Sequence, residues 1–252
     1  MTSLRFIDAV AKEKSIRKAA EKLAITSTAL NRRILQIEDE IGQPLFERLA
    51  SGVRLNTAGE LFVQHIRAQQ ADLARVQSQL ADLSGMRRGH VRVTSGAETL
   101  RHFLPDVIAR YRSEHSAVTF DVSRQHGEAA EAALASLETD LALIFEPIRH
   151  SDFQTVATTR QAVYCFMAET HDLAQLKTIR LHHLIDTPVI LPTTHSGVRQ
   201  LLNVGLIRRN INLAAMLETD SQEFTQNYVH NEQVIGFQIP IGLPPDMANG
   251  RP

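Results

Sequence analysis

The stretch TSTALNRRILQIEDEIGQPLFERLASGVRLNTAGE, from Thr26 to Glu60, combines two patterns that together decide the fold. Its first half carries apolar residues that share one face of an α-helix, namely Leu30, Ile34, Ile37 and Ile41. Its second half follows Gly42 and Pro44 and reads as two very short strands around Ser51-Gly52. A helix that reads nucleic acid, followed by a basic wing, would give this pattern. An ordinary amphipathic helix with a loop after it would give the same pattern.

The residues before Thr26 predict two more short helices. Leu4, Ile7 and Val10 repeat at helical spacing, and Ser15 can cap a second helix. Thr26 can cap the third helix in the same way. The first 56 residues are therefore predicted to form one unit of three helices and a two-stranded ribbon.

The polar face at the start of the third helix is the candidate reading surface. Its members carry short or forked hydrogen-bonding side chains: Ser27, Thr28, Asn31 and Arg32. A recognition helix presents this end to base edges in the major groove, where Asn can address adenine and Arg can address guanine. Arg48 and Arg54 flank the tip of the ribbon, from which they can hold the DNA backbone. The alternative for each helix residue is a solvated polar surface.

Charge is distributed unevenly along the chain. Residues 1–90 hold 14 Lys and Arg against 10 Asp and Glu, a net charge of +4, whereas the rest hold 13 against 18, a net charge of −5. A basic N-terminal third is what a phosphate-binding domain would leave, although a solvated surface can also carry a charge of this size.

The run LRFIDAVAKEKSIRKAAEKLAITSTALNRRILQIEDEIGQPLFER, with VRLNTAGE after it, resembles the winged helix-turn-helix of LysR-type transcriptional regulators almost position by position. The resemblance implies a sequence-specific transcriptional regulator whose partner is double-stranded DNA. The sequence departs from the family pattern at Lys14, where glycine is usual, and at Ile16, where an aromatic residue is common. It also departs on the reading face, at Ser27, Thr28 and Asn31, so the operator sequence does not carry over from relatives.

A long helix is predicted after the ribbon, over residues 57–84. Thr57 can cap it, with Glu60 at the third helical position, and the helix N-terminus can also accept a DNA phosphate. A heptad seam runs along it: Phe62, Ile66, Gln69, Leu73, Val76, Leu80 and Leu83. In the family this linker helix pairs two subunits, which implies a homodimer or homotetramer on an operator with dyad symmetry. Packing of the seam against the chain's own body is the alternative.

Residues 85–90 read as a hinge, and the pattern changes after them. Strand-like runs alternate with helical segments, as in α/β layers around a largely parallel sheet. The strand-like runs are VRVTS, VTFDVSR, DLALIF, AVYCFMA and TPVIL, and the helical segments lie near residues 101–113, 128–137, 196–209 and 222–230.

The order of these elements resembles the effector-binding domain of the same family, a two-lobed module similar to periplasmic solute-binding proteins. On that resemblance, residues 91–157 and the return after about residue 238 form the first lobe, and residues 163–238 form the second. The predicted fold is multi-domain: an all-α winged helix-turn-helix with a long linker helix, followed by a two-lobed α/β domain over residues 91–252.

A small-molecule cleft is expected where loops at the carboxyl ends of the strands meet between the lobes. The candidate effector contacts are Gly96, Ala97, Glu98, Thr99, Gly127, Glu128, His195, Ser196, Arg199, Asp220 and Ser221. Helix N-terminal amides and Arg199 favour an anionic effector, whereas Glu98 argues the other way. For each loop residue the alternative role is to cap its own helix.

Family members add a further strand and helix after the second lobe, whereas this sequence stops at Pro252, soon after the segment VIGFQIPIG. The residues DMANGRP read as a loop, so the first lobe is either shortened or completed differently. Two alternatives to an effector-controlled regulator follow. One is a regulator that binds DNA but no longer responds to ligand, and the other is a small-molecule binding protein whose N-terminal unit serves only oligomerisation.

Enzyme, metal and cofactor chemistry find no support in the sequence. The sequence contains no GxSxG, GxxxxGK[ST], GxGxxG or HExxH motif, and its histidines are scattered. Cys165 lies in an apolar run, which predicts a buried, inert thiol, and a redox sensor with an exposed thiol is the alternative. No apolar run reaches the length of a membrane span, and the charged N-terminus is unlike a signal peptide, so the expected location is the cytoplasm. We expect no cofactor, and RNA polymerase is a further candidate partner.

Overall fold

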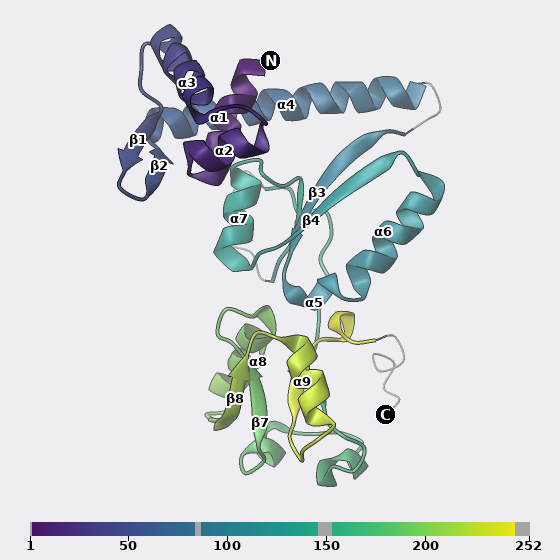
Figure 1. Ribbon diagram of the computed structural model, residues 1–252. Helices are drawn as coiled ribbons and strands as arrows, with labels where there is room; N and C mark the ends of the chain where they lie inside the picture. The colour runs from purple at the N-terminus through teal and green to yellow at the C-terminus, as the bar shows by residue number, and fades with distance from the viewer. Residues whose placement is uncertain (1, 84–86, 146–152, 245–252) are drawn as a thin grey trace. The chain divides into compact units, whose positions relative to one another are not determined.

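The computed structural model describes the backbone of residues 2–83, 87–145 and 153–244, with side chains from residue 5 to residue 80 in the first of these ranges. The chain divides into two compact units, Met1–Leu80 and Ala81–Pro252. Figure 1 labels many of their helices and strands. Each unit has its own hydrophobic core, and each is described by itself.

The N-terminal unit contains the three predicted helices and the predicted ribbon. They are α1 (Thr2–Glu13), α2 (Ile16–Lys22), α3 (Ser27–Ile41), β1 (Phe46–Leu49), β2 (Gly52–Leu55) and the long helix α4 (Thr57–Leu83). The predicted caps are present, because the hydroxyl of Ser15 accepts from the Lys18 amide at 3.4 Å and that of Thr26 accepts from the Ala29 amide at 3.2 Å. Gly42 ends α3 in the left-handed conformation, with φ of 75°.

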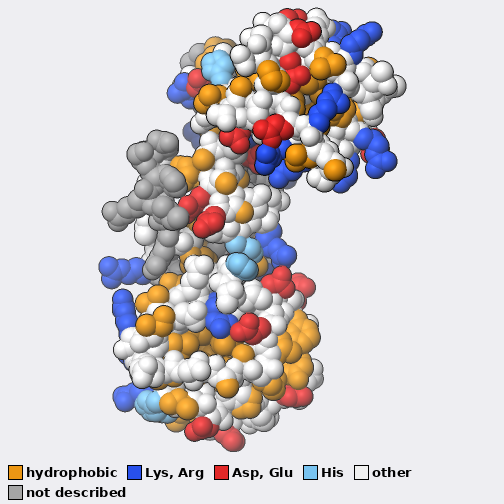
Figure 2. Space-filling view, turned by 90° about the vertical axis from the view of Figure 1, so that its left-hand side faces the viewer, with side chains coloured by type: hydrophobic (Ala, Val, Ile, Leu, Met, Phe, Trp, Pro, Cys, Tyr) orange, Lys and Arg blue, Asp and Glu red, His pale blue; other side chains and the backbone are white. Residues whose placement is uncertain are grey.

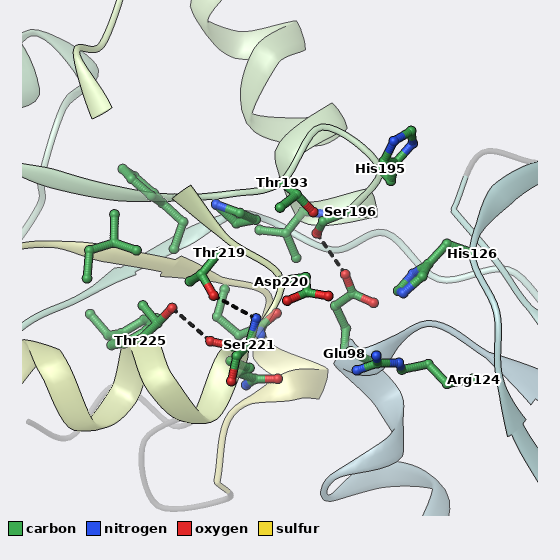
Figure 3. A pocket seen from close by; sticks show the side chains of 18 of the residues that line it. Glu98, Arg124, His126, Thr193, His195, Ser196, Thr219, Asp220, Ser221 and Thr225 are labelled. Carbon is green, nitrogen blue, oxygen red and sulfur yellow. Dashed lines mark hydrogen bonds between the residues drawn. The ribbon is translucent and has the colours of Figure 1, made fainter. Parts of the chain in front are cut away.

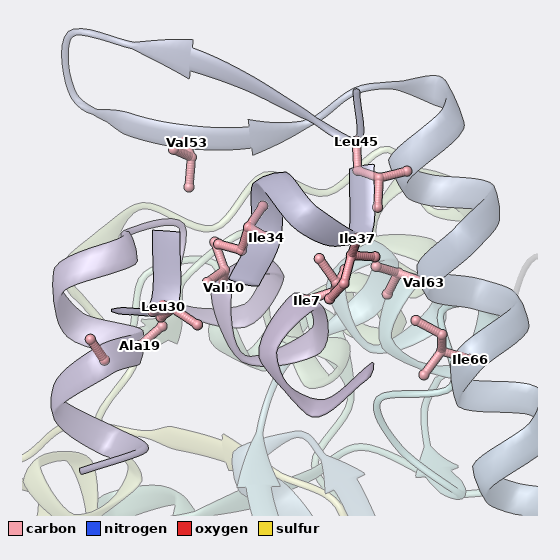
Figure 4. Close-up of a cluster of buried hydrophobic side chains, with 11 residues drawn as sticks. Ile7, Val10, Ala19, Leu30, Ile34, Ile37, Leu45, Val53, Val63 and Ile66 are labelled. Carbon is pink, nitrogen blue, oxygen red and sulfur yellow. The ribbon is translucent and has the colours of Figure 1, made fainter. Parts of the chain in front are cut away.

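The core of this unit is built from the stripe predicted on α3 and from residues of the elements around it (Figure 4). Its buried members include Ile7, Val10, Leu30, Ile34, Ile37, Leu45, Val63 and Ile66. The prediction that Ile41 belongs to this stripe was wrong. Ile41 is the last residue of α3 and is 38% exposed, so the buried stripe ends one turn earlier, at Ile37.

Ion pairs link α1 to α4. The Nε of Arg67 donates to Asp8 at 2.7 Å, and Lys12 pairs with the same carboxylate at 2.8 Å. Burial alone would raise the pKa of Asp8, but hydrogen bonds and charge from Lys12 and Arg67 outweigh burial and hold the pKa below its ordinary value. The start of α4 is therefore fixed to the helical core by polar contacts as well as by packing.

The N-cap of α4 is Asn56, which corrects the prediction for Thr57. The Asn56 Oδ1 accepts from the Gly59 amide at 2.8 Å, and its Nδ2 donates to the Pro44 carbonyl at 2.8 Å. Asn56 can make both hydrogen bonds because its carboxamide carries an acceptor oxygen and a donor nitrogen. Thr57 is the first helical residue and is exposed.

The heptad seam of α4 divides into two parts. Phe62 and Ile66 pack into the core of their own unit, as the alternative reading expected. Leu73, Val76 and Leu80 are 38%, 46% and 60% exposed, and Gln69 is also exposed. The side chain of Leu83 lies outside the described residues. Only the second part of the seam is therefore available to a partner within the described unit.

The C-terminal unit begins with a parallel sheet of three strands. In the described residues β3 (Gly89–Ser95) lies between β4 (Val118–Arg124) and β5 (Leu141–Leu143). Helices α5 (Ala97–Leu100), α6 (Phe103–Glu114) and α7 (Gly127–Ala135) connect them. We call this group the first lobe.

The second lobe holds two strand pairs. Strand β7 (Val189–Pro192) is parallel to β8 (Ala215–Thr219), and β6 (Tyr164–Phe166) is antiparallel to β9 (Gly236–Gln238). A bridge between Val189 and Ile235 joins the pairs. The helices are α8 (Gly197–Arg208), α9 (Gln222–Val229) and three short 3-10 turns at Asp172–Gln175, Leu181–Leu184 and Pro240–Gly242.

The sequence missed one strand and left the role of another open. The strand β8 was not predicted, and β9, in the segment expected to begin the return, pairs within the second lobe. The chain then reaches the first lobe, because a Cβ built on Gly242 would lie 2.9 Å from the Glu98 carbonyl oxygen. The predicted loop at residues 246–252 and part of the predicted hinge, residues 85–86, lie outside the described residues.

Candidate DNA-reading surface and effector cavity

The four residues predicted to read bases lie at the N-terminal end of α3, outside its buried stripe. Ser27, Thr28 and Arg32 are exposed, and Asn31 is half-buried. They are one helical turn apart or adjacent, so they share the N-terminal part of one face. Residues of these types on an exposed helix start can reach base edges in a groove.

The wing contributes its two arginines on different faces. In the β1–β2 ladder Arg48 lies opposite Val53, and Glu47 lies opposite Arg54, so successive pairs point to opposite sides. Val53 belongs to the core, so Arg48 is on the inner face, and its Nη2 donates to Asn31 Oδ1 at 2.9 Å. Arg54 is on the outer face in an exposed ion pair with Glu47 at 2.5 Å. The hydrogen bond and charge of Glu47 raise the pKa of Arg54.

The wing is held at its tip by the turn between α1 and α2. The Val53 amide donates to the Lys14 carbonyl at 3.0 Å. Gly52 has φ of 142°, and a Cβ there would lie 2.4 Å from the same oxygen. Figure 2 shows one face of the molecule, on which blue basic side chains of the N-terminal unit are interspersed with red acidic ones. The placement of individual arginines therefore matters more than the net charge.

A cavity of about 490 Å³ lies between the two lobes of the C-terminal unit (Figure 3). Its wall is formed by residues after β3 and β4 from the first lobe and by residues at the ends of β7 and β8 from the second. Carboxyl ends of strands in α/β sheets are the usual place for ligand sites. Six of the predicted effector contacts line it: Ala97, Glu98, His195, Ser196, Asp220 and Ser221.

The other five predicted contacts do not line the cavity: Gly96, Thr99, Gly127, Glu128 and Arg199. Arg199 is committed elsewhere, because its Nη1 donates to the Pro192 carbonyl at 2.9 Å and to Glu218 at 3.0 Å. The buried hydroxyl of Thr99 is hydrogen-bonded to that of Ser95. Glu128 is exposed at the start of α7. The argument from Arg199 for an anionic effector is thereby removed.

Several cavity hydroxyls also cap helices and turns. The Ser196 Oγ accepts from the Val198 amide at 3.2 Å, and the Ser221 Oγ accepts from the Phe224 amide at 3.1 Å. The Thr219 Oγ1 accepts from the Ser221 amide at 3.0 Å. The capping alternative is thus met at Ser196 and Ser221 while both residues line the cavity.

Sequence reasoning missed much of the lining. The missed polar residues are Arg124, His126, Thr193, Thr219, Gln222, Thr225 and Gln238, and the missed apolar ones include Phe166, Ile190, Val198 and Phe237. Arg124 and His126 could have been found, since they stand at and just after the end of the predicted strand VTFDVSR. Thr219 ends a strand that the sequence pattern did not reveal.

Metal clusters and membrane spans are both absent from the described part of the chain. Among those residues no group of three or more His, Cys, Asp and Glu side chains could hold a metal ion. No helix among them is long and apolar enough to cross a membrane.

A winged helical unit with an exposed reading face, joined to a two-lobed unit with a ligand-sized cavity, defines a DNA-binding regulator that responds to a small molecule. Residues 1–60 match the bacterial regulatory helix-turn-helix protein of the lysR family, and residues 84–251 match the LysR substrate binding domain. The chain belongs to the LysR family of transcriptional regulators. This is a family of regulators rather than of enzymes.

Relatives with assigned names support the same conclusion. The chain is 30% identical to a RuBisCO operon transcriptional regulator of Allochromatium vinosum over 202 residues, which cover 80% of this chain and 67% of the relative. It is 23% identical to the transcriptional activator CmpR of Synechocystis over 242 residues, 96% of this chain and 79% of the relative.

Solved structures share the fold. A substituted form of full-length OxyR from Pseudomonas aeruginosa aligns with a TM-score of 0.71 at 20% identity, over 96% of this chain and 78% of that one. Full-length CbnR in complex with its target DNA aligns with a TM-score of 0.61 at 15% identity, over 95% and 83%. These structures support the fold, while the two family matches identify the protein as a DNA-binding transcriptional regulator with an effector-binding domain.

Proposed function

We propose that this regulator reads a dyad-symmetric operator with the N-terminal part of α3 while the wing holds the DNA backbone. The observation that carries the proposal is the 2.9 Å hydrogen bond from Arg48 to Asn31, which joins wing and reading helix into one surface. A surface of this kind can enter the major groove with the helix and follow the adjacent backbone with the ribbon.

Each predicted DNA contact has a distinct role in this proposal. Ser27, Thr28, Asn31 and Arg32 contact bases, with Asn31 suited to adenine and Arg32 to guanine. Arg48, Arg54 and Thr57 contact phosphates, the last from the exposed first turn of α4. Because the reading face departs from the usual family residues, we propose an operator sequence particular to this protein.

The exposed part of the α4 seam supports a homo-oligomer. Leu73, Val76 and Leu80 follow one heptad stripe and are exposed in the N-terminal unit. Pairing of two such stripes would bury them and supply two reading helices for the two halves of a dyad. Gln69 would set the register of the pair at some cost in stability. Pairing through this stripe alone gives a dimer, and a tetramer would need a second interface.

The cavity between the lobes is the proposed effector site, and ligand binding there would shift the equilibrium between two arrangements of the oligomer on DNA. Contact with RNA polymerase and residence in the cytoplasm are further parts of the proposal, since transcription regulation needs both DNA and polymerase within reach. We propose no catalytic role for any residue.

The test is a selection of bound fragments from genomic DNA, followed by the salt dependence of binding to the enriched site. An enriched sequence with dyad symmetry and a steep salt slope is expected. Asn31→Ala and Arg32→Ala should relax the preference at separate positions of that site, whereas Arg209→Ala, an exposed arginine of the C-terminal unit, should change nothing.

The two alternatives give different results. A binding protein whose N-terminal unit serves only oligomerisation would enrich no sequence above random fragments. A regulator that has lost its ligand response would enrich a site, but no small molecule would raise its midpoint of thermal unfolding.

A further inference from the structure

Glu98 is a buried carboxylate in the lining of the cavity. It is the second residue of α5, immediately after the central strand β3, and it is only 4% exposed. One oxygen, Oε1, accepts a hydrogen bond from the Ser196 hydroxyl of the second lobe at 2.9 Å (Figure 3). The other oxygen, Oε2, is buried and has no hydrogen-bond partner among the described residues. Buried charged oxygens without a donor are costly and rare in folded proteins.

The backbone of Gly96 and the ring of His126 lie next to this oxygen. A Cβ built on Gly96 would lie 2.4 Å from Glu98 Oε2 and 3.2 Å from the Nδ1 of His126. A side chain at residue 96 would therefore collide with the carboxylate, so the glycine allows Glu98 to lie here. His126 and Arg124 are drawn on the same side of Figure 3 as Glu98, and neither is hydrogen-bonded to it among the described contacts.

Several other polar side chains of the cavity are already hydrogen-bonded within the protein. Thr225 donates to the Ser221 carbonyl at 3.1 Å, and Gln222 donates to the Gly242 carbonyl at 2.7 Å. Gln238 accepts from the Ile239 amide at 2.9 Å. With Thr219 and Ser221 engaged as described above, Glu98 Oε2 is the buried acceptor of the cavity that still requires a donor.

We infer that the cavity binds a small molecule through an ammonium group that donates a hydrogen bond to Glu98 Oε2. This inference rests on the proposed function, in which the cavity is the effector site. A charged N–H donor is favoured over a neutral one because charge-assisted hydrogen bonds are the stronger kind and because the partner carboxylate is buried. Asp220 adds a second carboxylate to the same lining, whereas Arg199 is turned to other partners.

The remaining lining narrows the class of ligand. Arg124 and His126, from the first lobe, can receive a carboxylate of the same molecule, and Phe166, Ile190 and Phe237 can cover an apolar part. A cavity of about 490 Å³ accommodates a molecule of amino-acid size or somewhat larger. Amino acids and small amines that carry a primary ammonium group are therefore the ligands that fit best.

The test uses the full-length protein and matched pairs of compounds that differ in the ammonium group. The pairs are the protein amino acids with their 2-hydroxy acids, and linear diamines with the corresponding diols. Thermal unfolding and titration calorimetry should show that at least one ammonium compound raises the unfolding midpoint while its hydroxyl counterpart does not. Glu98→Gln should weaken that binding by about tenfold or more, because a hydrogen bond to a charged group is lost.

The same variant gives a readout without ligand. If Oε2 lacks a donor in the ligand-free protein, Glu98→Gln removes a buried charge and should raise the unfolding midpoint by about 2–4 °C. A lower midpoint would show that Oε2 already has a donor in the free protein, for example His126, and would overturn the inference. Glu128→Gln, which removes an exposed carboxylate outside the cavity, is the matched control and should change neither stability nor binding.

Three binding results would also overturn the inference: no ammonium compound stabilises the protein, only carboxylate or hydroxyl compounds do, or Glu98→Gln leaves ammonium binding unchanged. Binding of an anion alone would leave the proposed function standing, since the cavity would still be an effector site. Failure of the genomic selection would count against the proposed function and would leave ammonium binding to be judged by these titrations.

Discussion

Lys14 has a strained backbone conformation that the fold nevertheless requires. It sits between α1 and α2 with φ of 51°, in the left-handed region that glycine adopts most easily. Its carbonyl accepts from the Val53 amide and thereby fixes the wing. The resemblance to the family places glycine at this position, so the backbone conformation is the shared feature and the lysine side chain is the departure.

Lys14→Gly should therefore stabilise the N-terminal unit by about 1 kcal/mol, because a non-glycine residue is strained in this conformation. Denaturant unfolding followed by helical signal measures the change. Lys18→Gly, inside α2, should instead destabilise it by about 0.5–1 kcal/mol. A Lys14→Gly protein that unfolds at lower denaturant than the wild type would contradict the strain argument.

Asp8 makes stability depend on pH. Replacing it with asparagine leaves the buried Arg67 with a weaker partner and should cost about 1–3 kcal/mol at neutral pH. The folded pKa of Asp8 is held below the ordinary 3.8, so its contribution is present above that pH and is lost as the pH falls through the folded value. The difference in unfolding free energy between wild type and Asp8→Asn should thus be constant from pH 7 to about pH 5 and shrink below pH 4. Asp72→Asn, on exposed α4 surface, should show little difference at any pH.

Arg48 is predicted to act both through its charge and through Asn31. Arg48→Ala should weaken binding to every DNA sequence, flatten the salt slope by about one unit, and also relax the base preference set by Asn31. Arg48→Lys keeps the charge but lacks the planar guanidinium that reaches Asn31, so it should retain the slope and lose part of the preference. A double-mutant cycle with Asn31→Ala measures this coupling. Strictly additive effects would show that the two residues act separately.

At the scale of elements, the sequence was sufficient to predict a helix or strand where one of its faces had to be buried. The α3 stripe, the Ser15 and Thr26 caps and four helices of the C-terminal unit could be predicted, with ends displaced by a few residues. The strand β8 could not, because its residues Ala215–Thr219 are largely exposed and show no clear alternation. The heptad seam indicated one surface, whereas tertiary packing assigned its first half to the core and its second half to solvent.

The lining of the cavity could likewise be predicted only where local sequence signals were strong. Some residues in loops after predicted strands were found, such as Glu98 and His195, because strand ends predict where ligand sites gather. Residues contributed by β8, β9 and α9, such as Thr219, Gln238 and Thr225, depend on how distant segments meet, which local sequence does not encode. Arg199 was assigned by residue type, and its partners Pro192 and Glu218 could be seen only in the fold.

The two halves of the α4 seam should respond differently to substitution. Leu73→Asp combined with Leu80→Asp should shift the protein toward monomers without lowering the stability of the N-terminal unit, because both side chains are exposed there. Ile66→Ala should cost about 2–5 kcal/mol of that stability, because it leaves a cavity in the core. Sedimentation and denaturant unfolding measure the two effects. Gln79→Asp is the control, and an unchanged oligomer in the Leu73/Leu80 variant would exclude this stripe as an interface.

At the scale of the whole molecule, the two units rest on separate cores. The buried cluster of the N-terminal unit shares no residue with the clusters around Leu202 and Ile190 in the other. Cooperative unfolding follows continuous cores, so each unit is expected to behave as its own unfolding unit.

Calorimetry should accordingly resolve two transitions. Leu30→Ala should lower the temperature of one transition and Leu202→Ala that of the other. Each substitution should cost its unit about 2–5 kcal/mol of unfolding free energy. Leu49→Ala serves as the control, because Leu49 is exposed, and it should shift both transition temperatures by less than either core substitution. A single transition shifted equally by both substitutions would mean that the units unfold together.

The lone cysteine, Cys165 in β6, offers a practical consequence. Burial raises the pKa of its thiol to about 11, so at pH 8 only roughly one thiol in a thousand is ionised, and reagents that attack thiolates will be slow to modify it. A second cysteine placed on an exposed site could then be tagged selectively with a fluorophore or spin label. Cys165 itself is half-buried and not fully buried as its apolar run predicted, so its raised pKa, and not complete shielding, would keep the background labelling low.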